Sequence, residues 1–234
     1  MDDYFFEFFN SEKQYGFRFL KSKNNSVCGD HNLIKDTENF SYIINCDGVS
    51  ATSSPEKSSR LLIETLDEHF KNLKSKKPRL GKITEIINKV NKEYLKKDLA
   101  TTLDLFVFSK KFNYYLGLGD SSFYIFNEDD QIHFQNWIHN QSKIIEDHFG
   151  SSFGPDNVLV NCVGIQHPRF EMSENIKLVK NYKLLFYSDG LEQFFTSPEQ
   201  IYKFCSQVMN SEKFDDTFFD NNNDDLSIVF CILK

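Results

Sequence analysis

Short apolar runs, each bounded by Asp or Gly, recur along this chain and constrain its fold more than any other feature. The run from Phe40 to Cys46 stops at Asp47-Gly48, and the run from Ile176 to Tyr187 stops at Ser188-Asp189-Gly190. A last apolar run, Leu226 to Leu233, follows an acidic segment. Runs of this length that are rich in Ile, Val, Tyr and Phe predict β-strands. We therefore expect strands that begin or end at acidic residues.

Three segments with helical spacing separate these strands. Ser53-Ser54-Pro55-Glu56 is typical of a helix start, and apolar residues then recur on one face as far as Leu73. A second helix is expected from about Ile83 to Leu95, and a third begins at Ser197-Pro198-Glu199. The basic segment 71–82 between the first two predicts a solvated turn, with a docking patch as the alternative.

The remaining segments complete the expected fold. Tyr15 to Leu20 predicts a strand, and Thr101 to Gln135 alternates with period two, which predicts an antiparallel meander. Residues 136–170 lack a regular pattern and predict an irregular, mobile insertion. Because strands and helices are segregated along the chain, the fold class is α+β with a core of two sheets.

Composition limits the function classes. A chain of 234 residues with 40% hydrophobic content can close one core, so we expect a single domain over residues 1–234. A net charge of −7 argues against nucleic acid as a partner. The N-terminus lacks the basic start of a signal peptide, and no uncharged stretch approaches about 18 residues, so no membrane partner is expected. Five widely spaced cysteines without a C-x-x-C predict a reduced, cytoplasmic setting.

Four aspartates stand at predicted strand ends, and they carry the chemical argument. They are Asp47, Asp120, Asp189 and Asp224, and no Lys or Arg lies within their four motifs. If the strand ends meet, these carboxylates repel one another, and divalent cations would resolve the repulsion. Mg²⁺ or Mn²⁺ suits such an all-oxygen set. Two such ions can activate a water molecule for phosphoester hydrolysis.

The order of short motifs then resembles a known family. The motifs are Cys28-Gly29-Asp30, Asp47-Gly48, Thr101-Thr102, Gly119-Asp120-Ser121, Ser188-Asp189-Gly190-Leu191 and Asp224-Asp225. Together they resemble those of the metal-dependent protein phosphatases of type 2C, the PPM serine/threonine phosphatases, in a compact, bacterial-like form. The resemblance spans nearly the whole chain. It implies a four-layer α-β-β-α sandwich in which two stacked antiparallel sheets are flanked by helix pairs.

The resemblance also implies roles for individual residues. Asp47 would bridge two Mn²⁺ or Mg²⁺ ions, and the carbonyl of Gly48 would hold the second. Asp189 and Asp224 would complete the first metal's ligands, with Asp225 as the alternative to Asp224. Asp30 would hydrogen-bond to metal-bound water, and Asp120 with Asp189 would serve a weaker third site. Asp30, Asp47 and Asp189 are thus the expected catalytic residues.

Several positions depart from the family pattern. The Arg that many members use to grip the substrate phosphate would fall near Asn25, so Lys21 or Lys23 could take its place. Gly29 stands where the family usually has Glu. Further departures are Val49 at a position where some members carry His, Ser50-Ala51 instead of a Gly pair, and Asp225 instead of Asn.

We therefore expect a monomeric phosphoprotein phosphatase, with phosphorylated proteins as substrates and a cognate Ser/Thr kinase as a natural partner. Residues 136–170 would select the substrate. A different reading is a catalytically weak or inactive module that keeps the fold for regulation or binding, and the departures at Asn25 and Gly29 motivate it. A third is a metal-dependent hydrolase of another phosphoester, such as a nucleotide, which the acidic composition disfavours.

Overall fold

The computed structural model describes residues 6–10, 13–20, 27–73, 77–139, 158–210 and 223–233. Its strands form two sheets in which all neighbours are antiparallel. The six-stranded sheet has the order β1 (Phe6–Asn10), β2 (Lys13–Leu20), β11 (Leu226–Leu233), β10 (Lys183–Tyr187), β7 (Ser122–Phe126) and β8 (Ile132–Gln135). The five-stranded sheet has the order β3 (His31–Asp36), β4 (Ser41–Cys46), β5 (Leu103–Phe108), β6 (Asn113–Leu118) and β9 (Glu171–Glu174).

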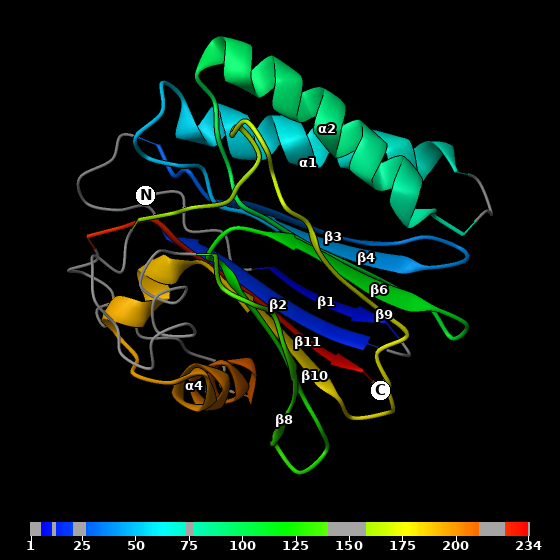
Figure 1. The fold of residues 1–234 in the computed structure, drawn as a ribbon. Coiled ribbons are helices and arrows are strands. Elements are labelled where there is room, and N and C mark those ends of the chain that lie inside the picture. The colour runs from blue at the N-terminus through cyan, green and yellow to red at the C-terminus, as the bar shows by residue number, and fades with distance from the viewer. Residues whose placement is uncertain are drawn as a thin grey trace, which may run out of the picture.

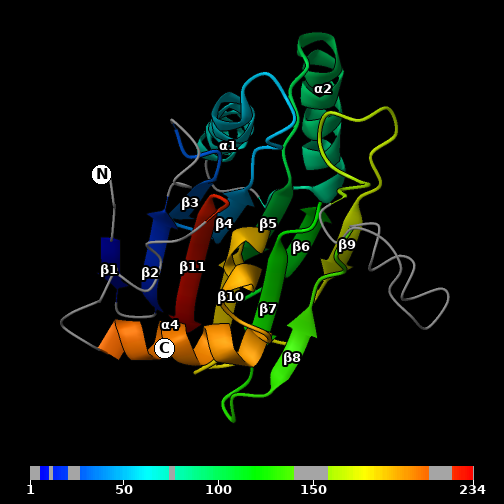
Figure 2. The same ribbon diagram turned by 90° about the vertical axis from the view of Figure 1, so that its left-hand side faces the viewer.

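Helices cover the outer faces of the two stacked sheets (Figure 1). Helices α1 (Pro55–Asn72) and α2 (Leu80–Lys97) lie on the five-stranded sheet. Helix α4 (Pro198–Asn210) and the short 3₁₀ helix η1 (Asp189–Gln193) lie on the six-stranded sheet, and α4 crosses below its strands in Figure 2. The predicted α+β sandwich with four layers is therefore confirmed.

Each interface between layers has its own apolar core. On α1 the buried residues Leu62, Leu66 and Phe70 follow at spacings of four, and they pack with Ile83 and Ile87 of α2. This spacing puts the apolar side chains of each helix on one face. The layer between the sheets is mostly aromatic and aliphatic and includes Ile43, Phe106, Phe108, Tyr115, Phe123, Phe186 and Val229. The third core joins α4 to the outer face of the six-stranded sheet.

Most of the predicted elements are present, but the meander is wrong. Strands β5 and β6 pair with each other, as do β7 and β8, yet β6 and β7 belong to different sheets. The chain crosses from one sheet to the other at Gly119-Asp120. Alternation with period two reports which residues share a face, and it carries no information on which sheet a strand joins. The crossing places Asp120 between the sheets' ends.

Other expectations need smaller corrections. The strand expected from Ile176 begins only at Lys183, and β1, β3 and β9 were not predicted. The turn in segment 71–82 is present between Asn72 and Leu80, with residues 74–76 outside the described residues. Of the predicted insertion, residues 140–157 lie outside the described residues, and 158–170 form neither helix nor extended strand.

Candidate active site

One end of the five-stranded sheet supplies two of the predicted carboxylates. His31, the first residue of β3, pairs with Cys46, the last residue of β4. Asp30 directly precedes β3 and Asp47 directly follows β4, so both residues lie at the same end of these two paired strands. Asp30 is only 2% exposed, and its negative charge helps to raise the pKa of Asp47.

The six-stranded sheet supplies two more carboxylates at the corresponding end. Tyr187, the last residue of β10, pairs with Ser122, the first residue of β7. Asp189 follows β10 by two residues, and Asp120 precedes β7 by two residues. Both therefore lie just past the same end of these two paired strands. The negative charge of Asp189 raises the pKa of Asp120, as expected for neighbouring carboxylates.

A hydrogen bond between the sheets brings these two ends together. Ser188 lies between β10 and Asp189, and its Oγ donates to Oδ2 of Asp30 at 2.6 Å. The same Oγ accepts the backbone N–H of Ser227 on β11 at 2.9 Å. Ser188 is fully buried, so it acts here as a structural link and not as an exposed nucleophile.

The turn at Asp47-Gly48 is held by the Thr pair before β5. Thr101 Oγ1 and the backbone N–H of Thr102 both donate to the carbonyl of Asp47 at 2.8 Å, while Thr102 Oγ1 accepts the N–H of Asp47 at 2.8 Å. Position 48 has room for Gly only, because a Cβ there would lie 2.2 Å from the carbonyl oxygen of Pro55. The Thr-Thr motif therefore fixes the backbone that presents Asp47 and the Gly48 carbonyl.

Burial and mutual repulsion raise the pKa of every predicted acidic site residue. Burial is the largest cause in each case. The pKa rises to about 7 for Asp30, to about 7 for Asp120 and to about 6 for Asp189, and it is also raised for Asp47 and Asp224. The other influences that raise these values are neighbouring carboxylates. Such a group strongly favours anything that neutralises negative charge.

The chemistry of this group fits hard divalent cations. The charges of Asp30, Asp189 and Asp120 all raise the pKa of Asp47 beyond the effect of burial. Oδ1 of Asp30 is buried without a hydrogen-bond partner. Among the described residues, no three His, Cys, Asp or Glu side chains are arranged to hold a metal ion as they stand. The all-oxygen donor set of these carboxyls suits Mg²⁺ or Mn²⁺.

Asp224 and Asp225, which directly precede β11, differ in exposure and in their contacts. Asp224 is exposed, and its charge raises the pKa of Asp189. Asp225 is 6% exposed, and its Oδ2 accepts the backbone N–H of Gly29 at 2.6 Å. The structure thus brings Asp30, Asp47, Asp120 and Asp189 together, with Asp224 beside them.

Several supporting residues were not predicted from the sequence. Ser59 of α1 donates to the carbonyl of Gly29 and contacts Nδ1 of His31 at 2.9 Å, so this His faces the helix. Asp225 was weighed only as a metal ligand, whereas it holds Gly29. These bonds join residues 28 to 196 positions apart, and no local motif signals them.

The fold thus places a cluster of carboxylates at the common end of two stacked antiparallel sheets. A family model described as "Protein phosphatase 2C" matches residues 21–222. The chain belongs to the protein phosphatase 2C family and is a phosphoprotein phosphatase. None of the curated proteins matches this chain.

Solved structures share the fold at low sequence identity. RsbX, crystallised in complex with magnesium, has a TM-score of 0.68 and 13% identity, over 99% of this chain and 100% of that one. Serine/threonine phosphatase Stp1 from Staphylococcus aureus has a TM-score of 0.74 and 16% identity, over 94% of each chain. The Mycobacterium tuberculosis serine/threonine phosphatase PstP/Ppp has a TM-score of 0.72 and 14% identity, over 95% of this chain and 99% of that one.

Proposed function

We propose that this chain hydrolyses phosphoserine and phosphothreonine in proteins and depends on two Mn²⁺ or Mg²⁺ ions. The observation that carries the proposal is the buried group of carboxyls from both sheets, whose pKa values are raised by burial and by one another. Without cations this group costs folding free energy at neutral pH, because its members must either bind protons or repel. A structural role alone would not favour such an arrangement.

Each carboxylate has a proposed role. Asp47 would supply ligand oxygens to both ions and the Gly48 carbonyl to the second. Asp189 and Asp224 would hold the first ion, and Asp120 with Asp189 would hold a weaker third. Asp30 would orient a water molecule through Oδ1, which has no hydrogen-bond partner, while Ser188 donates to its Oδ2. The bound ions would supply an activated water and would neutralise the oxygens of the substrate phosphate.

The departure at Gly29 is compatible with activity. A Cβ at this position would lie 3.2 Å from Oδ2 of Asp225 and 3.3 Å from the Gly48 carbonyl. Asp225 therefore brings a carboxylate close to the place where related phosphatases carry Glu. This favours the enzyme over the inactive binding module. Asn25, Lys21 and Lys23 lie outside the described residues.

The wider biological setting is part of the same proposal. We expect one domain over residues 1–234, a monomer, and a cytoplasmic enzyme that acts on substrates of a cognate Ser/Thr kinase. None of the helices in the described ranges is both long and apolar enough to cross a membrane. Substrate selection would lie in residues 136–170.

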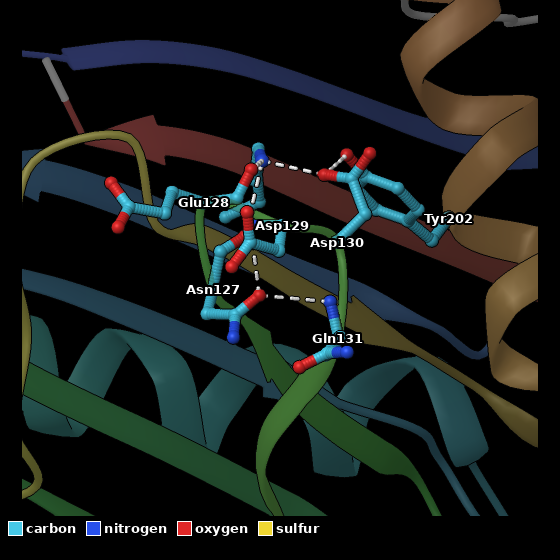
Figure 3. Close-up of polar contacts among 7 residues, drawn as sticks. Asn127, Glu128, Asp129, Asp130, Gln131 and Tyr202 are labelled. Carbon is cyan, nitrogen blue, oxygen red and sulfur yellow. Dashed lines mark hydrogen bonds and ion pairs between the residues drawn. The ribbon is translucent and has the colours of Figure 1, made fainter.

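The experiment is phosphate release from a phosphothreonine peptide with Mn²⁺, with EDTA, and with Asp189→Asn. We expect EDTA to abolish the rate, and the variant to lose more than the about 10–100-fold typical of groups that only orient metal ligands. Asp129→Asn is the matched control, because Asp129 is an exposed Asp in the turn after β7 (Figure 3). Activity that survives EDTA, or equal losses in both variants, contradicts the proposal.

A further inference from the structure

Two side chains on the segment that follows β8 hold the crossing between the sheets. This crossing, Gly119 to Ser121, leads from β6 in one sheet to β7 in the other and carries Asp120. Asn136 is 8% exposed and His139 is 4% exposed, although neither lies in a helix or a strand. Polar side chains that are buried this deeply are usually hydrogen-bonded, since an unpaired polar group costs free energy. The catalytic roles proposed above use neither residue.

Asn136 holds the chain just after Asp120. Its Nδ2 donates to the carbonyl of Ser121 at 2.9 Å, and its Oδ1 accepts the backbone N–H of Phe123 at 2.7 Å. The reverse orientation of the amide would set its oxygen against a carbonyl and its NH₂ against an N–H, so these two partners fix the orientation. The backbone N–H of Asn136 also donates to the carbonyl of Phe123 at 3.1 Å. The first residues after Asp120 are therefore tied to this one asparagine.

His139 holds the residue just before Asp120. Its backbone N–H donates to the carbonyl of Gly119 at 2.9 Å, and its ring Nδ1 accepts the backbone N–H of Gly119 at 3.0 Å. Nδ1 is equally 3.0 Å from the carbonyl oxygen of Gly119, but that oxygen already accepts the backbone N–H of His139. A proton on Nδ1 would point at the Gly119 N–H and would take away its acceptor. The geometry therefore places the ring proton on Nε2.

The backbone of Gly119 sets the direction in which the chain enters Asp120. Its φ of +120° lies in the region that favours glycine, and a Cβ would lie 2.6 Å from the Cβ of Thr102. Oγ1 of Thr102 accepts the N–H of Asp47 at 2.8 Å and lies 2.9 Å from the Oγ of Ser121. The crossing is thus held from one side by the turn at Asp47 and from the other by the segment after β8.

His139 is itself fixed in place by its neighbours. Its carbonyl accepts the backbone N–H of Val160 at 3.0 Å, and its ring meets Trp137 edge to face, with ring centroids 4.8 Å apart. The backbone N–H of Trp137 donates to Oε2 of Glu171 on β9 at 2.9 Å. Burial lowers the pKa of His139, and the contact with the Gly119 backbone opposes this, with a net decrease. The ring is therefore neutral at pH 8, as an acceptor nitrogen requires.

We propose that His139 is a positioning residue of the active site, whose Nδ1 accepts the N–H of Gly119 and thereby places the carboxylate of Asp120. Asn136 fixes the other side of the same crossing. The inference rests on the proposed function, because Asp120 is assigned there to the weaker third metal site. His139 touches neither substrate nor metal in this scheme. It acts through the backbone that presents Asp120.

The test compares His139→Leu, His139→Asn and the control His69→Leu. The Oδ1 of an asparagine can take the place of the histidine Nδ1 as an acceptor, whereas leucine has none. His69 is a half-buried residue near the end of α1, where its ring packs against Phe70 at 5.8 Å. It therefore matches the loss of a partly buried imidazole away from the site.

We expect His139→Leu to weaken the weakest phase of Mn²⁺ binding in calorimetry by about 10-fold, the lower end of the range for groups that orient metal ligands. Its kcat should fall by a similar factor with KM little changed, because the two tighter ions keep their ligands. His139→Asn should recover most of both values. His69→Leu should leave both unchanged.

The tautomer of His139 can be measured without turnover. Nitrogen-15 spectra of the imidazole rings at pH 8 in EDTA should show one ring with its proton on Nε2 that is missing from His139→Asn. Hydrogen exchange at the Gly119 amide should be slow in the wild type and in His139→Asn, and faster in His139→Leu. These two readouts report on the Gly119 contact itself, and a general loss of stability would not separate the Asn variant from the Leu variant.

The proposal is overturned if the His139 ring carries its proton on Nδ1, if His139→Asn loses as much Mn²⁺ affinity as His139→Leu, or if neither variant loses any. A wild type that binds Mn²⁺ without phosphatase activity would refute the proposed function alone. The tautomer and the Mn²⁺ affinities would still decide the role of His139, since neither needs turnover.

Discussion

Replacing Asp189 by Asn should make the metal-free protein more stable at alkaline pH. Burial and the charge of Asp224 raise the pKa of Asp189 from its ordinary 3.8 to about 6. A pKa change of one unit corresponds to about 1.4 kcal/mol, so this rise lowers the unfolding free energy by about 3 kcal/mol when Asp189 is charged. The folded-state pKa lies above the unfolded one, so the cost is absent below pH 3.8 and complete above pH 6. Asn carries no charge and avoids this cost.

Thermal unfolding in EDTA measures the effect. At pH 8 we expect Tm of Asp189→Asn to exceed that of the wild type by about 6–12 °C, at about 2–4 °C per kcal/mol for a chain of this size. About half of the free-energy difference should remain at pH 5, where the wild-type carboxyl is mostly protonated. The exposed control Asp129→Asn should show no gain at either pH.

Mn²⁺ should narrow the difference in stability between the wild type and Asp189→Asn. At about 100 times its Kd, a ligand adds about 2.7 kcal/mol to the stability of a protein that binds it only when folded. The wild type should gain this amount, and Asp189→Asn should gain less. A variant that unfolds below the wild type in EDTA at pH 8, or a difference that does not shrink at pH 5, would refute the reasoning.

Three more substitutions have expected outcomes. Asp67→Ala removes the acceptor of the Tyr42 hydroxyl at 2.6 Å beneath α1, and denaturant unfolding should show a loss of about 1–3 kcal/mol. Gly48→Ala places a Cβ 2.2 Å from the Pro55 carbonyl oxygen, and overpacking of this kind should cost about 1–3 kcal/mol and lower the affinity for Mn²⁺ in calorimetry. Tyr202→Phe removes a hydrogen bond from α4 to the turn after β7 (Figure 3), and it should cost about 0.5–1.5 kcal/mol and leave phosphate release unchanged.

Local sequence signals predicted the elements whose ends are marked by turn or capping residues. Strand β11 spans the predicted Leu226–Leu233, and α1 begins at Pro55 as predicted. Strand β3 was missed because its residues His31–Asp36 show no alternation, and all but the last are half-buried. The short β9, with the sequence EMSE, has no apolar run to mark it.

The acidic residues of the candidate site could be predicted from the sequence, but the hydrogen bonds that hold them could not. Its acidic residues follow from their positions at strand ends, because strands that pair place their ends together. The bonds that hold them do not follow, since Ser188 and Asp30 are 158 positions apart and Gly29 and Asp225 are 196 apart. Only the stacking of the two sheets brings these pairs into contact, and no local pattern encodes it.

The many aromatic side chains between the two sheets help to keep the carboxylates of the site together. Asp120 and Asp189 flank β7 and β10 of one sheet, and Phe123 of β7 packs against Phe106 of β5 in the other sheet, with ring centroids 5.1 Å apart. Asp30 and Asp47 belong to the other sheet, so the carboxylates stay together only while the sheets stay stacked. The group repels itself without cations, and large apolar contacts must oppose that repulsion. Part of the 25 phenylalanines thus holds the two halves of the site together.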